Sequence, residues 1–248
     1  MTVQNPSLER AVRLLDRLAQ PQTHATTLAQ LTRELALPKS SVHGLLNSLV
    51  ALDLARKEPD GRFALGPRAL HWASAYGQQN SLVQQFKACL ERQPLLHAET
   101  IMLAVLNQTP ASPAKVNARG KITTPAHEPA AQTVQVMYLA CRAGTRPLAV
   151  TFREGGQFPA YCTSSGKAIL ATYPDEQIKQ LLGAGPFKKL TDKTLGSPKA
   201  VMQNIETIRT QGFAVDDEET AIGMHCFGAP VFNADPSSVS TNLSFLFE

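Results

Sequence analysis

The feature that most constrains the fold is a pair of short amphipathic segments that meet at Leu37 and Pro38. The first segment carries Leu28, Leu31 and Leu35 on one helical face. A proline removes a helical hydrogen bond and restricts the residue before it, so one continuous helix across Pro38 is excluded. The sequence therefore predicts two short helices joined by a tight turn, the arrangement of a helix-turn-helix.

The segment after the proline has one apolar and one polar face. Val42, Leu45, Leu46 and Leu49 recur at helical spacing and predict the buried side. The opposite face carries short or polar residues, at Lys39, Ser40, Ser41, His43, Gly44 and Asn47. Such a helix packs through one face and leaves hydrogen-bonding groups on the other.

Two further elements flank this pair. A helix is predicted between Leu8 and Leu18, which Asn5 or Ser7 can cap. After the pair, Glu-Pro-Asp-Gly at residues 58–61 has the signature of a type I turn between two strand-like runs. Basic residues stand on both sides of the turn, at Arg56, Lys57 and Arg62. Three helices followed by a basic hairpin predict a winged helix-turn-helix.

These basic and polar groups favour DNA as the partner. A recognition helix presents its N-terminal residues to the major groove, and a wing lies along the adjacent backbone or enters the minor groove. Residues 1–80 hold nine Lys and Arg against six Asp and Glu, so the basic excess is concentrated there. The predicted DNA-binding residues are Lys39, Ser40, Ser41, His43, Asn47, Arg56, Lys57 and Arg62. The alternative is a small packing module, because winged helices also mediate protein contacts.

Residues 7–70 resemble the N-terminal domain of the IclR family of bacterial regulators. The run Leu-Pro-Lys-Ser-Ser-Val-His at 37–43 is similar to that family's recognition helix. The runs at 60–63 and 65–68 are similar to its wing and to the start of its linker. Gly44 departs from the pattern, because the family usually carries arginine there. We therefore do not expect the operator preference of relatives to carry over.

The residues after the wing are predicted to form a linker helix from Arg68 to Leu90. Gly77 and the polar residues that follow it interrupt the helical pattern. We therefore expect a winged helix-turn-helix domain with the start of the linker at 1–77 and a larger domain at 78–248.

The larger domain mixes strands and helices without a regular βαβ repeat, which predicts an α+β fold with an antiparallel sheet. Helices are expected to begin at Ser164, Asp175 and Ser197. Strand-like runs are found at 100–106, 134–140, 148–152, 213–217, 227–232 and 242–247. The proline-rich run near 107–133 is expected to be a surface insertion.

The resemblance to the IclR family continues into this domain. The run Gly-Phe-Ala-Val-Asp-Asp-Glu-Glu at 212–219, followed by Gly223, Cys226 and Ala-Pro-Val-Phe-Asn at 229–233, is similar to its C-terminal signature. The resemblance implies a GAF-like or profilin-like sensor domain that holds a small effector, often a carboxylate or an aromatic acid. Family members normally continue into a C-terminal helix, so we expect part of the outer layer after Glu248 to be missing or replaced by a partner subunit.

The resemblance also implies which residues contact the effector: Ser164, Ser165, Asp216, Cys226 and Ser244. The chemistry is reasonable by itself, because backbone N–H groups at Ser165 and Gly166 would open a helix whose positive end attracts a carboxylate. Asp216 can accept a hydrogen bond from a ligand hydroxyl. The alternative is that Asp216 caps a turn and that Cys226 is a small buried apolar residue. Tyr161 replaces a histidine that is usual in the family.

Other functions have less support. An enzyme would need a nucleophile and a base, and the candidates are Cys162, Cys226 and His225. The last two are adjacent and would face opposite sides of a strand. No hydrolase, nucleotide-binding or metalloprotease motif occurs, and the cysteines and histidines lack metal-site spacing. We therefore expect no catalytic residue, metal or cofactor, and we expect reduced thiols.

Taken together, the sequence predicts an effector-responsive bacterial transcription regulator, either a repressor or an activator. It is expected to bind double-stranded operator DNA as a homodimer or homotetramer and to sense a small carboxylic or aromatic acid. No signal peptide or long apolar run is found, so a cytoplasmic location without membrane contact is expected. The alternatives are a protein-interaction module and a small-molecule-processing enzyme.

Overall fold

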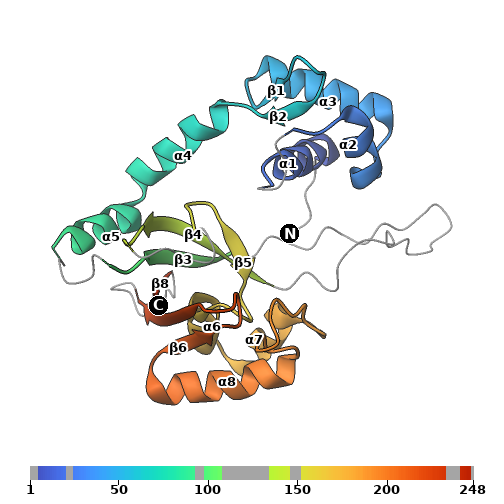
Figure 1. The fold of residues 1–248 in the computed structure, drawn as a ribbon. Helices are drawn as coiled ribbons and strands as arrows, with labels where there is room; N and C mark the ends of the chain where they lie inside the picture. Colours follow the sequence, from blue (N-terminus) through green and yellow to red (C-terminus); the bar gives the residue numbers. More distant parts are fainter. Residues whose placement is uncertain are drawn as a thin grey trace. The chain divides into compact units, whose positions relative to one another are not determined.

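The computed structural model forms two compact units, Met1–Ser81 and Leu82–Glu248, each with a core of its own (Figure 1). It describes residues 5–20, 25–92, 98–107, 134–145, 152–232 and, for the backbone only, 241–246.

Three helices open the first unit: α1 (Pro6–Leu18), α2 (Leu28–Leu35) and α3 (Lys39–Ala51). Side chains at the starts of α1 and α2 satisfy N–H groups that have no partner inside a helix. Asn5 Oδ1 accepts from the backbone N–H groups of Ser7 and Leu8. Thr27 and Gln30 form a capping box, in which each side chain accepts from the backbone N–H of the other residue.

The helices pack around the apolar core that their helical spacing predicts. Leu14, Leu31 and Leu46, one from each helix, are fully buried. After α2 the chain reverses at Ala36, whose φ is +50°, and enters α3 through Pro38. This is the helix-turn-helix that the proline predicts.

A two-stranded hairpin completes the winged helix-turn-helix. β1 (Ala55–Lys57) and β2 (Phe63–Leu65) pair antiparallel. At the tip, the Gly61 N–H donates to the Glu58 carbonyl, and Gly61 has a φ of +81°, which glycine adopts without strain. The predicted N-terminal architecture is therefore confirmed.

The helical linker breaks at Asn80, the last residue of the polar run that follows Gly77 in the predicted interruption. α4 (Arg68–Gln79) runs through Gly77, and α5 (Ser81–Glu91) begins after Asn80. A single glycine costs a helix only ~1 kcal/mol relative to alanine, which here does not end α4. The extended backbone at Asn80, with a ψ of 105°, does end it. The compact units accordingly divide after Ser81.

The second unit is built on one antiparallel sheet with the strand order β5-β4-β3-β8-β7-β6. The strands are β3 (Ile101–Asn107), β4 (Gln135–Arg142), β5 (Gln157–Pro159), β6 (Ala214–Asp217), β7 (His225–Val231) and β8 (Thr241–Leu246). This sheet confirms the α+β class. The short β5 was not predicted. The runs expected as a strand at 148–152 and as an insertion at 107–133 lie outside the described residues, except for Phe152 and Asn107.

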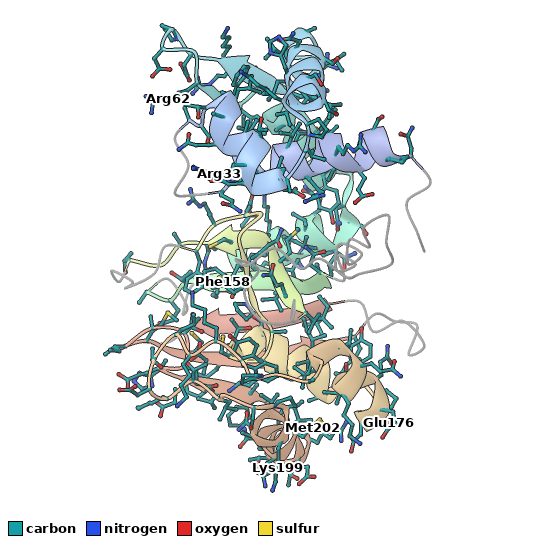
Figure 2. The ribbon with its side chains drawn as sticks, turned by 90° about the vertical axis from the view of Figure 1, so that its right-hand side faces the viewer. Arg33, Arg62, Phe158, Glu176, Lys199 and Met202 are labelled. Carbon is teal, nitrogen blue, oxygen red and sulfur yellow. The ribbon has the colours of Figure 1, made fainter. Side chains whose placement is uncertain are left out.

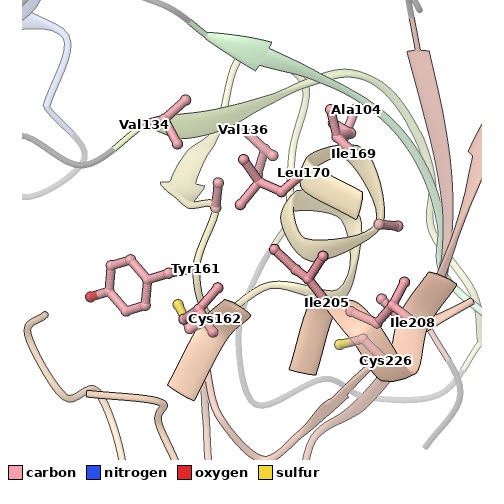
Figure 3. Packing of buried hydrophobic residues seen from close by; sticks show 14 of the residues in the cluster. Ala104, Val134, Val136, Tyr161, Cys162, Ile169, Leu170, Ile205, Ile208 and Cys226 are labelled. Atoms are coloured by element: carbon pink, nitrogen blue, oxygen red, sulfur yellow. The ribbon is translucent and has the colours of Figure 1, made fainter. Parts of the chain in front are cut away.

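Helices cover both faces of the sheet. On one face, Phe86 and Leu90 of α5 pack with Ile101 and Leu103 of β3. On the other face, α6 lies against β7 and packs with α8 in the larger core (Figure 3). The helices on that side are α6 (Ser164–Ala171), α7 (Asp175–Leu182) and α8 (Pro198–Gln211), and all three begin where the sequence predicts.

Leu46→Ala is expected to lower the free energy of unfolding by about 2–5 kcal/mol, because it leaves a cavity under α3. The matched control is Leu52→Ala, at an exposed leucine just after α3, and its effect should be below about 0.5 kcal/mol. Urea denaturation followed by circular dichroism measures both variants. Equal losses would contradict the assignment of this α3 face to the core.

Candidate functional site

The exposed side of α3 carries most of the residues predicted to contact DNA. Lys39, Ser40, His43 and Asn47 are all exposed and fall within about 100° of helical arc. Asn47 Nδ2 lies 3.2 Å from His43 Nε2, so these side chains are linked one turn apart. Ser41 is partly exposed and lies further round the helix. Four of the five predicted residues of this helix therefore share one open surface.

Gly44 lies on the exposed side of the same helix. A Cβ added there would meet no heavy atom within 4 Å. The position therefore has room for a side chain, and the glycine leaves a gap beside His43 and Asn47 where a longer residue would project.

The wing pairs its arginines with its own carboxylates. Arg62 Nε donates to Asp60 Oδ2 at 2.6 Å, and Arg56 Nη2 lies 3.1 Å from Glu58 Oε1 (Arg62 is labelled in Figure 2). The Arg62 backbone N–H and guanidinium hold the pKa of Asp60 below its usual value. Lys57 is exposed. Sequence reasoning treated the arginines as available cations and missed these pairs, although both carboxylates are only two residues away.

The first turn of α6 is packed very closely against its neighbours. Thr163 Oγ1 caps the helix by accepting from the Gly166 N–H at 3.1 Å. A Cβ on Gly166 would lie 2.3 Å from Ala160 Cα, and a Cβ on Gly228 of β7 would lie 2.7 Å from the Ser164 carbonyl carbon. Both glycines are therefore required for the backbone segments to approach this closely.

The strand register brings the other predicted effector residues to the same turn. Asp216 of β6 pairs with Cys226 of β7, and Gly228 of β7 pairs with Ser244 of β8. Cross-strand partners share a face of the sheet, as do residues two apart on one strand. All four positions are thus on the face that Gly228 presents to Ser164. The fold places the five predicted effector positions side by side.

Asp216 holds the turn that follows β6. Its Oδ1 accepts from the backbone N–H groups of Glu219 at 2.7 Å and Thr220 at 3.2 Å, and its Oδ2 accepts from the Thr220 hydroxyl at 2.5 Å. Burial raises the pKa of Asp216 above its usual value, against the opposing effect of these hydrogen bonds. This geometry supports the alternative that Asp216 caps a turn.

A buried ion pair lies behind the same turn, and sequence reasoning missed it. Lys167 of α6 is fully buried, and its Nζ donates to the Val215 carbonyl at 2.6 Å and to Glu219 Oε1. Burial raises the pKa of Glu219, although Lys167 opposes the shift. A lysine directly before the apolar run Ala-Ile-Leu at 168–170 was the available signal. The pair ties α6 to the segment that follows β6.

Three further groups lie at or near the first turn of α6. Within the part of the chain that the structure describes, Ser165 Oγ is buried without a hydrogen-bond partner. Cys226 is buried in the core on the α6 side of the sheet (Figure 3). Tyr138 of β4 is buried on the same side of the sheet; burial raises the pKa of its phenol, and the Ser165 side chain opposes this shift. Sequence reasoning did not include Tyr138, because it is distant in the chain.

A shallow hollow of about 260 Å³ lies at the opposite end of α6. It is lined by Ala168, Ala171, Thr172, Ile208, Arg209, Gly212, Pro230 and Phe232. The Arg209 guanidinium there is occupied by the Asp175 carboxylate and by the carbonyls of Ala171 and Tyr173. None of the predicted effector residues borders this hollow.

The described residues give no support to metal or nucleophilic chemistry. Among them, no group of three His, Cys, Asp or Glu side chains could hold a metal ion. Burial raises the pKa of Cys162 to about 12, which keeps it a thiol rather than a reactive thiolate at neutral pH. His225 is exposed and Cys226 buried, on opposite sides of β7 as predicted. No helix in these ranges is long and apolar enough to cross a membrane.

Lys167→Met is expected to destabilise the fold by about 3–5 kcal/mol, because it leaves the Glu219 carboxylate buried without its cation. The double variant Lys167→Met/Glu219→Leu should recover much of that loss, since no unpaired charge then remains. Urea denaturation of both variants measures the difference. A single variant as stable as the wild type would show that the buried pair does not form.

Two family models match the chain. The model of the IclR helix-turn-helix domain matches residues 7–59, and that of the bacterial transcriptional regulator IclR C-terminal domain matches residues 130–245. The transcriptional repressor IclR of Escherichia coli K12 is 27% identical, over 94% of this chain and 76% of that protein. The Pca regulon regulatory protein of Pseudomonas putida is also 27% identical, over 92% of this chain and 69% of that protein.

Solved structures show the same fold. An IclR transcriptional regulator from Alicyclobacillus acidocaldarius aligns with a TM-score of 0.76 at 20% identity, over 98% of this chain and 88% of that one. An IclR homologue from Microbacterium hydrocarbonoxydans, solved with 4-hydroxybenzoate, aligns with a TM-score of 0.69 at 20% identity, over 97% and 88%. The matching domains and relatives are those of transcription regulators, not of enzymes. The chain therefore belongs to the IclR family of bacterial transcription regulators, with a helix-turn-helix domain and a C-terminal ligand-binding domain.

Proposed function

We propose that this chain binds operator DNA as a homodimer or homotetramer in the cytoplasm, and that a small carboxylic or aromatic acid bound beside α6 changes its affinity for that DNA. The proposal rests mainly on the exposed polar surface of α3, which belongs to a helix-turn-helix of the IclR family. This surface is formed by Lys39, Ser40, His43 and Asn47. Its neighbouring wing supplies Arg56, Lys57 and Arg62.

The start of α3 is suited to phosphate. Its N-cap is Pro38, which makes no side-chain hydrogen bond to the first turn. The first backbone N–H groups of a helix point outward and attract anions. With Lys39 and Ser40 exposed at the same end, α3 offers a phosphate site that fixes the helix in the major groove. Ser41 lies beside this site in the proposed complex.

Exposed apolar side chains on α4 support self-association. Leu70, Trp72 and Tyr76 are 75%, 53% and 52% exposed, and no described residue of α4 is buried. Aromatic residues are enriched in protein interfaces. A second copy that covers them would place two recognition helices about 34 Å apart, in successive major grooves.

The effector site that we propose contains the five positions that the fold brings together: Ser164, Ser165, Asp216, Cys226 and Ser244. A carboxylate would lie at the positive end of α6, near the unpartnered Ser165 hydroxyl. Asp216 uses three of the roughly four acceptor positions of a carboxylate, so it can still receive one ligand hydroxyl. The neighbour solved with 4-hydroxybenzoate is consistent with this chemistry.

The two units would communicate by a change in their relative arrangement when the acid binds. Allosteric coupling of this kind is typically worth about 1–3 kcal/mol, or roughly 5- to 150-fold in DNA affinity. Both repression and activation fit this scheme.

Lys39→Ala is expected to weaken binding to double-stranded DNA of mixed sequence and to reduce the log–log salt slope by about 1, because one phosphate contact is lost. Lys199→Ala, at an exposed lysine of α8 in the second unit, is the charge-matched control and should leave the slope unchanged. Fluorescence anisotropy over a range of salt concentrations measures both. An unchanged slope for Lys39→Ala would contradict the phosphate contact. A wild type without salt-dependent DNA affinity would favour a protein-interaction module instead.

A further inference from the structure

The first turn of α6 carries a buried hydroxyl that has no hydrogen-bond partner among the described residues. Ser165 is 1% exposed, and among the described residues its Oγ has no hydrogen-bond partner. A buried hydroxyl in this state loses its hydrogen bonds to water without replacement, which is unfavourable. A ligand that hydrogen-bonds to Ser165 would remove this cost.

A second hydroxyl faces the same point from the sheet. Tyr138 of β4 is 2% exposed and lies on the side of the sheet that α6 covers. Its ring packs edge-on against Phe152, at 5.6 Å between centroids, and at a tilt against Phe158, at 5.7 Å. This packing fixes the ring on the α6 side of the sheet, where the Ser165 side chain is close enough to lower the pKa of the Tyr138 phenol against the effect of burial. Among the described residues, Ser165 Oγ nevertheless has no partner within hydrogen-bond geometry.

The donors at this point are neutral. Burial holds the pKa of the Tyr138 phenol above its usual value, so it keeps its proton and can donate. The buried cation near this turn, Lys167, is already engaged by Glu219 and by the Val215 carbonyl. A ligand carboxylate would therefore be held by hydroxyls and by backbone N–H groups of the first turn other than that of Gly166, which Thr163 already caps, and not by an ion pair.

We infer that Tyr138 is an effector-contacting residue of this chain, and that its hydroxyl and that of Ser165 together receive the carboxylate of the acid. This inference rests on the proposed effector site. It adds to that site a residue from β4, on the same face of the sheet as the predicted strand positions. It also assigns a role to the aromatic packing of Phe152 and Phe158, which holds the Tyr138 ring in position.

The test compares two buried tyrosines. Tyr138→Phe removes the hydroxyl and keeps the ring. Tyr161→Phe is the matched control, because Tyr161 is equally buried, is stacked on Phe187 at 4.4 Å, and donates its hydroxyl to the Lys188 carbonyl at 2.6 Å. Isothermal titration calorimetry with benzoate, 4-hydroxybenzoate and acetate measures acid affinity for the full chain. Thermal unfolding without ligand checks that each variant is folded.

We expect Tyr138→Phe to weaken acid binding about 10- to 100-fold, the loss typical of a hydrogen bond to a charged group. Ser165→Ala should show a loss of similar size, and Tyr161→Phe should bind like the wild type. Wild-type affinity in Tyr138→Phe, or an equal loss in both tyrosine variants, would overturn the role of Tyr138 and leave the proposed function standing. Failure of all three acids to bind the wild type would instead overturn the proposed effector class, and this inference with it.

Discussion

The close approach of α6 to β7 is the constraint on which the second unit depends. Gly228 and Gly166 have no side chain to separate the first turn of α6 from β7 and from the Ala160 segment. This approach brings the first turn of α6 against β7, next to the sheet edge where Asp216 of β6 pairs with Cys226 of β7. The polar groups on that face are therefore buried, and each of them must find a partner.

The buried polar groups around this turn find hydrogen-bond partners in different ways. Asp216 uses three of its roughly four acceptor positions to hold the turn after β6, and Lys167 is neutralised by Glu219. Among the predicted effector side chains that the structure describes, only that of Ser165 is buried without a hydrogen bond. Glu219 Oε2, beside the same turn, is likewise buried without a hydrogen-bond partner among the described residues. A few polar groups in a mostly apolar site are what orients a small ligand.

Local patterns in the sequence predicted the first unit well, because helix spacing, Pro38 and the turn at 58–61 act over a few residues. They also predicted the helices of the second unit. They did not predict the wing's internal ion pairs, the Lys167–Glu219 pair or the position of Tyr138, because those depend on which side chains the folded chain brings together. The linker helix was predicted to be interrupted by Gly77 and the polar run after it, and extended backbone at Asn80, the last residue of that run, ends α4. The effector positions came from family resemblance, and strand register explains why they lie together.

The central claim is that an acid bound at the first turn of α6 changes DNA affinity. The most direct measurement is the DNA affinity of the full chain with and without a saturating amount of the tightest-binding acid, for the wild type, Ser165→Val and Thr210→Val. Thr210 is an exposed residue of α8 and serves as the control. The wild type and Thr210→Val should shift by roughly 5- to 150-fold, and Ser165→Val should bind DNA normally without responding to the acid. A full response in Ser165→Val would contradict the claim.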